Sequence, residues 1–199
     1  MAMPNEDLAR SISDAVQARR EEAVSLLQEL VHIRSVTGEE GAMAEVVERA
    51  FSERGLEVDT WNASPEEMEP YIDHVGEQPS YENRPNVVGL RRGSGGGRSI
   101  LLNAHIDTVD PGDPAAWTHD PLAGAVEGDL LYGRGSCDMK GGLVTHLLAL
   151  DALSDLGLNL RGDVNVAHAP DEHISVTELL TTASTLACLL ADWCGVDED

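Results

Sequence analysis

A histidine and an aspartate two residues apart, His105 and Asp107, are the side chains of this sequence best suited to chemistry. They close an apolar stretch, residues 101–109, that is typical of a buried β-strand. Residues two apart in a strand point to the same face, and open α/β sheets place their ligand sites at the carboxyl ends of strands. A neutral imidazole beside a carboxylate is a metal ligand with its orienting partner. The pattern therefore predicts a metal site here.

A second acidic residue, Asp138, lies in the glycine-framed segment Gly133–Gly142, before an apolar helix. Asp is a favoured helix N-cap, which is the alternative role for this residue. The glycines at 135, 141 and 142 allow close backbone packing and favour a ligand role. The adjacent Cys137 is either a further ligand or a spacer.

His168 ends a strand over residues 164–168 and precedes a turn with a proline, which again is a strand-end position; by itself it is equally a structural residue. The other histidines lack such a setting, and His146 falls on the helix that follows Asp138: they are His32, His74, His119, His146 and His173. Imidazoles and carboxylates together suit zinc, cobalt or manganese. Two such ions bridged by one carboxylate can activate a water for hydrolysis, with a nearby Glu or Asp as proton shuttle.

The elements that must position these residues alternate between helices and strands, which predicts an α/β fold with parallel strand pairs. Asn5 can cap the first helix, Gly55 can end the second, and Ser175 and Glu178 have capping-box spacing. The glycine run 93–97 predicts a hairpin; a phosphate cradle is the alternative. The expected helices are 5–34, 39–54, 138–156 and 175–193, the strands are 56–61, 86–91, 98–104 and 162–167, and a short hairpin covers 125–132.

The composition excludes several functions. The formal net charge is −23, from 36 acidic and 13 basic residues, which argues against nucleic acid and anionic membrane surfaces as partners. Such an acidic surface predicts folding that improves with added salt, as in a salt-rich cytoplasm. The three cysteines form no disulfide framework, which fits a reducing, cytoplasmic location. We also expect no signal peptide, because residues 1–25 are charged throughout, and no membrane span.

Three motifs together resemble the zinc peptidase family of acetylornithine deacetylase, succinyl-diaminopimelate desuccinylase, aminoacylase and glutamate carboxypeptidase. They are His105–Val109, Trp117–Pro121 and Leu131–Gly142. The resemblance implies a three-layer α/β sandwich with a mixed, partly parallel sheet. It implies that His105 binds one metal, that Asp138 bridges two, and that Asp107 supports catalysis. The implied reaction is hydrolysis of the amide bond of an N-acyl amino acid or a small peptide, with Zn²⁺, Co²⁺ or Mn²⁺.

The sequence also departs from that family. Residues 1–166 resemble the N-terminal part of the catalytic domain and residues 167–199 its C-terminal segment, so that the chain reads as one partial domain without a lid or dimerisation domain. On this alignment His168 is the ligand of the second metal, and the general base is missing. A rival alignment makes Asp171 and Glu172 stand in for the family's acidic pair.

Two functions remain open at this point. One is a metal-dependent amidohydrolase that is impaired because it lacks the general base, and that binds two metal ions, one or none. The other is an inactive remnant that binds metal or a partner. Uncovered sheet edges and helix faces would favour self-association or a companion chain that supplies the missing half.

Overall fold

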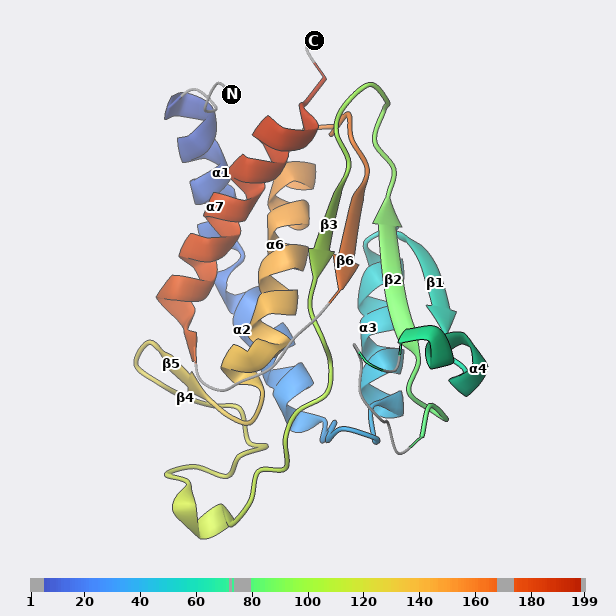
Figure 1. Cartoon of the computed structure of the whole chain (residues 1–199). Helices are drawn as coiled ribbons and strands as arrows, with labels where there is room; N and C mark the ends of the chain where they lie inside the picture. The colour runs from blue at the N-terminus through green and yellow to red at the C-terminus, as the bar shows by residue number, and fades with distance from the viewer. Residues whose placement is uncertain (1–5, 72, 74–79, 168–173, 198–199) are drawn as a thin grey trace.

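A computed structural model describes residues 6–71, 73, 80–167 and 174–197 of the 199-residue chain (Figure 1). The helices are α1 (Glu6–Ala18), α2 (Arg20–His32), α3 (Gly41–Glu53), α4 (Pro65–Met68), α6 (Gly141–Asp155) and α7 (Val176–Cys194). The strands are β1 (Glu57–Trp61), β2 (Asn86–Arg91), β3 (Ile100–Asn103), β4 (Ala125–Glu127), β5 (Leu130–Tyr132), β6 (Val164–Ala167) and β7 (Ile174–Ser175). Within the described ranges, no helix is both long and apolar enough to cross a membrane.

The main sheet has four strands in the order β1-β2-β6-β3. The pairs β1–β2 and β2–β6 are antiparallel, whereas β3 and β6 are parallel, with Ile100 opposite Val164 and Leu102 opposite Val166. A smaller sheet has the order β4-β5-β7. The predicted α/β class with a mixed, partly parallel sheet is therefore confirmed.

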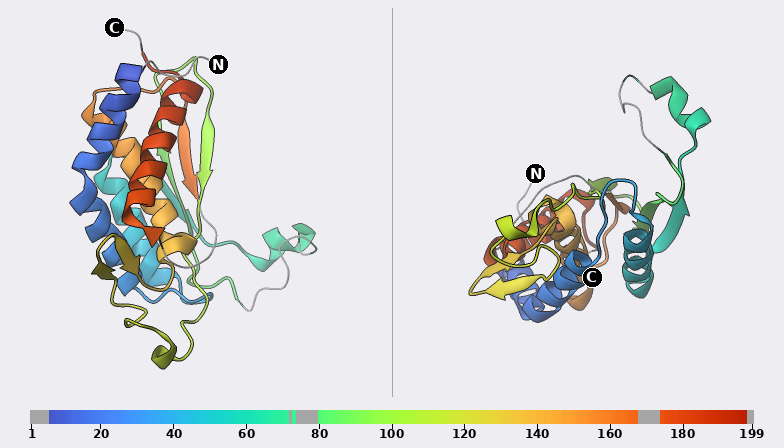
Figure 2. Two further views of the ribbon diagram at one scale, coloured as in Figure 1. Left: turned by 90° about the vertical axis from the view of Figure 1, so that its left-hand side faces the viewer. Right: turned by 90° about the horizontal axis from the view of Figure 1, so that it is seen from below.

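The core lies between the main sheet and the helices behind it. Figures 1 and 2 show α3 behind β1 and β2, and α6 beside β3 at the edge of the sheet, with α1 and α2 farther from the sheet. The residues that fill this layer are fully or almost fully buried: Leu27, Leu30, Phe51, Leu143, Leu147, Leu150, Val164 and Val166. On the opposite face of β3, Leu101 is 62% exposed. The described part thus comprises the sheet and one helical layer of the expected sandwich.

The predicted hairpin between β2 and β3 is wrong. Strand β6 lies between them, and the glycine run that joins them packs against the turn before β6. A Cβ at Gly93 or Gly97 would lie within 2.7 Å of backbone atoms of Arg161. The glycines therefore serve close backbone packing at this crossover, which neither a two-stranded hairpin nor a phosphate cradle requires.

The first helix differs from the prediction, and the last begins against a turn far away in the sequence. The first helix is two helices, because the chain breaks at Arg19, whose backbone angles (φ −94°, ψ 13°) are not helical. Helix α7 begins at the tip of the β4–β5 hairpin: the backbone nitrogens of Val176 and Thr177 donate to the carbonyl and a carboxylate oxygen of Asp129. Asn5 and the side chains of Ser175 and Glu178 lie outside the described part of the structure.

Other local predictions are confirmed. The hairpin over 125–132 forms with Gly128 at φ 61°, and Gly55 follows α3 at φ 69°, the left-handed conformation that glycine favours. The segment 62–85 contains the short helix α4 and, directly after it, a 3₁₀ turn, Glu69–Tyr71.

Candidate functional site

The strand-end residues His105 and Asp107 share a face, as their spacing predicts. Strand β3 ends at Asn103, but the alternation continues beyond it: Ala104, Ile106 and Thr108 are buried, and the residues between them are partly exposed. The two side chains meet, with His105 Nδ1 3.1 Å from Asp107 Oδ1. A carboxylate at this nitrogen leaves Nε2 as the atom available to a metal ion.

Asp138 is brought to this imidazole by the glycine-framed segment. Its Oδ1 lies 4.0 Å from His105 Nε2, and the residue is only 5% exposed. Asp138 is not the N-cap of α6. It lies in an irregular π-helical turn, Ser136–Lys140, with extended backbone angles (φ −123°, ψ 89°), and α6 itself begins at Gly141. The carboxylate therefore faces the strand-end motif instead of capping the helix.

The donor pair fits a metal ion. In a tetrahedral zinc site with bonds of about 2.0–2.2 Å, two ligand atoms lie about 3.4 Å apart, so a side-chain movement of about 0.6 Å would let one ion contact both His105 Nε2 and Asp138 Oδ1, which are 4.0 Å apart here. A complete site needs further ligands: residues placed by the structure contain no group of three His, Cys, Asp or Glu side chains arranged for a metal. The third predicted ligand, His168, and the rival residues Asp171 and Glu172 lie outside those residues.

The electrostatics of His105 reflect its position between two carboxylates. Burial lowers the pKa of His105, while the charges of Asp107 and Asp138 act in the opposite direction. The net effect favours the neutral imidazole, which is the form that binds a metal ion.

A residue that sequence analysis missed, Thr37, supports Asp107. Its hydroxyl donates to Asp107 Oδ2 over 2.6 Å, and the backbone of Thr108 exchanges hydrogen bonds with Ser35 and Thr37. The stretch after α2 therefore runs along the strand-end motif as a short parallel bridge. In the sequence, the segment around Thr37 indicated only the end of a helix, and nothing local links it to Asp107.

Lys140, the single lysine of the chain, is also part of this region. It is 2% exposed, and its Nζ donates to the carbonyl oxygens of Leu30 and Ile33, each over 2.9 Å. Burial lowers the pKa of Lys140 to about 8.

The remaining candidates lie apart from this pair. Cys137 is exposed, and His119 stacks on Tyr132, with ring centroids 4.7 Å apart. His146 is on α6, where burial lowers its pKa to about 4, and its Nδ1 is buried without a hydrogen-bond partner.

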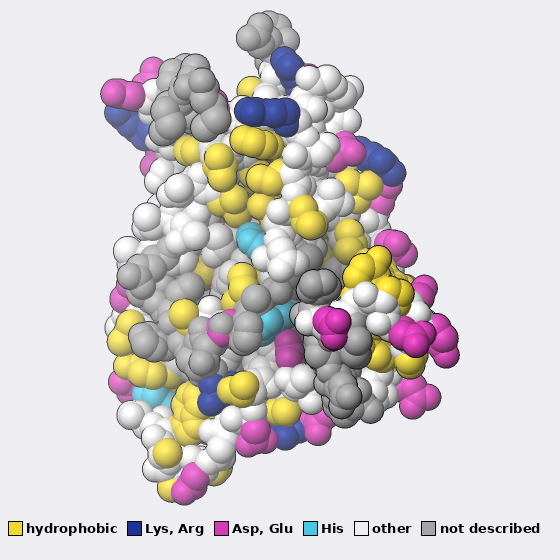
Figure 3. Space-filling view, viewed as in Figure 1, with side chains coloured by type: hydrophobic (Ala, Val, Ile, Leu, Met, Phe, Trp, Pro, Cys, Tyr) yellow, Lys and Arg dark blue, Asp and Glu magenta, His cyan; other side chains and the backbone are white. Residues whose placement is uncertain are grey.

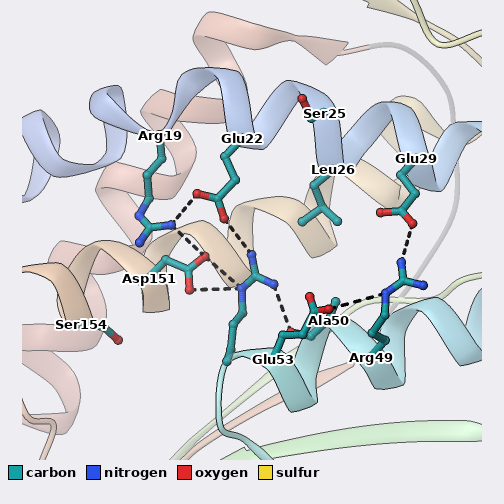
Figure 4. A pocket seen from close by; sticks show the side chains of 11 residues that line it. Arg19, Glu22, Ser25, Leu26, Glu29, Arg49, Ala50, Glu53, Asp151 and Ser154 are labelled. Atoms are coloured by element: carbon teal, nitrogen blue, oxygen red, sulfur yellow. Dashed lines mark hydrogen bonds and ion pairs between the residues drawn. The ribbon is translucent and has the colours of Figure 1, made fainter.

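A separate cavity of about 520 Å³ lies between α2, α3 and α6 (Figure 4). Its lining is charged, and the charges are paired. Arg54 binds both carboxylate oxygens of Asp151 at 2.9 and 3.1 Å, and Arg19 lies 3.7 Å from the same carboxylate. Arg49 pairs with Glu29 at the rim.

The fold and the site together define an α/β chain that presents a His-x-Asp motif at the end of a parallel strand, next to a buried carboxylate from a glycine-framed turn. Residues 101–184, which include both motifs, match the model of peptidase family M20/M25/M40. Residues 101–184 therefore carry the sequence pattern of this family, as the three motifs predict.

Two kinds of relatives agree with this assignment. The chain is similar to a succinyl-diaminopimelate desuccinylase of Methylobacterium sp. (strain 4-46), with 35% identity over 150 residues, 75% of this chain and 34% of the relative. It therefore spans about a third of the length of that protein.

Among solved structures, the dipeptidase Dug1p of Saccharomyces cerevisiae superimposes with a TM-score of 0.68 at 16% identity, over 81% of this chain and 34% of that one. An M20 family metallo-carboxypeptidase, Sso-CP2 from Sulfolobus solfataricus, has a TM-score of 0.59 at 18% identity, over 75% and 30%. At such identities the likeness shows the fold alone.

Proposed function

We propose that this chain provides part of a metal-dependent amide hydrolase site, in which His105 and Asp138 bind the ion and Asp107 holds the His105 imidazole. The observation that carries the proposal is the 4.0 Å approach of His105 Nε2 to Asp138 Oδ1, with a carboxylate on the other side of the ring. Zinc, cobalt or manganese suits these donors, and a bound ion of this kind polarises a carbonyl and acidifies a water. His168 is the third ligand in this proposal.

The proposed substrate is an N-acyl amino acid or a small peptide. Support comes from relatives described as a succinyl-diaminopimelate desuccinylase, a dipeptidase and a metallo-carboxypeptidase. We infer that the proton shuttle is missing, because on the favoured alignment residues 167–199 resemble the family's C-terminal segment instead of supplying the acidic pair expected after strand β6. Loss of that general base costs on the order of 10²–10⁴ in rate.

The test is a titration of the metal-stripped chain with Zn²⁺ and Co²⁺, followed by assays with N-acetyl and N-succinyl amino acids and dipeptides. We expect stoichiometric metal binding, lost in His105→Ala, with weak or no turnover. His32→Ala, at an exposed position on α2, is the matched control and retains the ion. Absence of metal binding by the wild-type chain would refute the proposal. Fast turnover abolished by His105→Ala would refute the missing base.

A second candidate, association without catalysis, is favoured by the open face of the sheet. Figure 3 shows apolar side chains gathered on the face of the molecule seen in Figure 1. On β3, Leu101 is 62% exposed. An exposed apolar patch of this kind favours a contact with a second copy of the chain. Light scattering of the wild type and of Leu101→Gln tests it: a dimer that becomes a monomer supports association, and a monomeric wild type contradicts it.

We further propose that the protein works in a reducing, salt-rich cytoplasm. The supporting observations are the net charge of −23 and three cysteines that are all free. Fractionation of the cells that make the protein is the measurement, and recovery outside the cytoplasm would contradict it.

A further inference from the structure

The buried lysine of the glycine-framed turn has an unusual set of contacts. Lys140 Nζ makes hydrogen bonds to the carbonyl oxygens of Leu30 and Ile33, at the end of α2. No carboxylate lies within ion-pair distance of this ammonium among the residues that the structure places. The carbonyl oxygens at the negative end of the α2 dipole take the place of a carboxylate.

These contacts attach the turn that carries Asp138 to α2. Lys140 is two residues after Asp138, and its backbone nitrogen donates to the carbonyl of Gly135 over 2.8 Å. Its aliphatic stem passes close to Gly135: a Cβ there would lie 3.1 Å from Lys140 Cδ and 2.6 Å from Thr108 Cγ2. Gly135 (φ 79°) therefore lets the lysine stem and the strand-end motif pack on the same turn.

The other half of the site is attached to the same part of the chain. Thr108 N donates to Ser35 O over 2.7 Å, and the Thr37 hydroxyl donates to Asp107. Residues 30–37, the end of α2 and the stretch after it, thus contact both metal-ligand motifs. The strand-end motif contacts them through Asp107 and Thr108, and the glycine-framed turn through Lys140.

We infer that Lys140 is a positioning residue of the metal site: its ammonium, held by the carbonyls of Leu30 and Ile33, sets the position of Asp138 relative to His105. Lys140 does not touch the ion in this arrangement. It acts through the turn that it anchors, just as the partners of metal ligands commonly fix the geometry of those ligands. The inference rests on the proposed function, since it requires that His105 and Asp138 bind a metal ion.

The main experiment compares the affinity for Co²⁺ of the wild type and of Lys140→Met, which keeps the apolar stem and removes the ammonium. Affinity is measured by competition with a chelator, and the visible spectrum of bound Co²⁺ reports its coordination geometry. We expect 10–100-fold weaker binding and an altered spectrum, the range typical for loss of a supporting partner.

A destabilised control separates positioning from general stability. Leu190 is a fully buried residue of α7, outside the contacts of the turn, and Leu190→Ala should lower the melting temperature without weakening Co²⁺ binding. If Lys140→Met behaves like Leu190→Ala, with a lower melting temperature and wild-type affinity, Lys140 is structural only and the inference is overturned. If the wild type itself binds no Co²⁺, the proposed function fails, and the inference fails with it.

A measurement on the wild type covers the case in which Lys140→Met does not fold. Because the chain has a single lysine, ¹⁵N-lysine labelling gives one side-chain ammonium signal. Coupling is reciprocal, so metal binding at His105 and Asp138 should slow the exchange of the Lys140 ammonium protons with water. Unchanged exchange on addition of saturating Zn²⁺ would overturn the inference.

Discussion

Two polar regions of this molecule treat their carboxylates in opposite ways. In the cavity between α2, α3 and α6, carboxylates are paired with guanidinium groups, as Asp151 is with Arg54 and Arg19 (Figure 4). At the end of β3, two carboxylates flank one imidazole whose pKa is lowered by burial. The first region neutralises its charge with the protein's own cations, and the second gathers negative charge around a neutral ligand, where an added cation would be favourable. The charged cavity is therefore a weaker indication of a functional site than the group of side chains at the end of β3.

The largest expected effect concerns the paired region. Arg54→Met leaves Asp151, whose pKa burial raises, without the guanidinium whose Nε contacts both of its carboxylate oxygens. Since these side chains are only 15% and 11% exposed, we expect a loss of roughly 2–4 kcal/mol in the free energy of unfolding, measured with urea. Co²⁺ affinity should not change. A variant that lost metal affinity as well would show that the two regions are not independent.

Removal of the hydroxyl that supports Asp107 tests the other region. Thr37→Val keeps the shape of the side chain but loses the donor to Asp107 Oδ2, so we expect Co²⁺ affinity to fall by about 10–100-fold with little change in stability. Thr37→Ser should retain the affinity. Thr181→Val is the matched control, because the Thr181 hydroxyl donates only to a helix carbonyl. Equal Co²⁺ affinity of Thr37→Val and Thr181→Val would show that Thr37 does not support the metal site.

The buried imidazole of His146 tests whether burial alone makes the stability of the folded protein sensitive to acid. Its pKa is about 4 in the folded protein and 6.5 in the unfolded chain, so only the unfolded state gains a proton as the pH falls from about 6.5 to 4. The free energy of unfolding therefore falls by roughly 1–2 kcal/mol when the pH is lowered from 7 to 5. Urea unfolding at both pH values should show a smaller loss for His146→Gln than for the wild type. His32→Gln, at an exposed site, should behave as the wild type.

The smallest effect concerns the rim of the cavity. Arg49 and Glu29 are about half exposed, so Arg49→Met should cost only about 0.2–1 kcal/mol, and this cost should vanish in 1 M KCl, where the screening length is about 3 Å. Over the same range the melting temperature of the wild type should rise, because its net charge of −23 is screened. A melting temperature independent of KCl would contradict the expectation of a salt-adapted surface.

Local physical chemistry predicted much of this structure. The period of two places His105 and Asp107 on one face even beyond the end of β3, and Gly55 and Gly128 mark the turns at which a left-handed backbone is needed. The bounds of β2, Asn86–Arg91, follow from the pattern within one segment. Three of the predicted site residues, His105, Asp107 and Asp138, could be named from residue type and spacing alone. The metal-binding role of His105 and Asp138 and the supporting role of Asp107 stay predictions.

What the sequence alone determined is therefore the identity of these side chains and the short elements that carry them. Only the tertiary structure decided that β6 enters between β2 and β3, that Asp138 turns away from the N-cap of α6 to face His105, and that the end of α2 holds Lys140. The physical reason is the range of the interactions. Pattern and propensity act over a few neighbouring residues, whereas these three arrangements depend on backbone hydrogen bonds and packing between segments far apart in the chain.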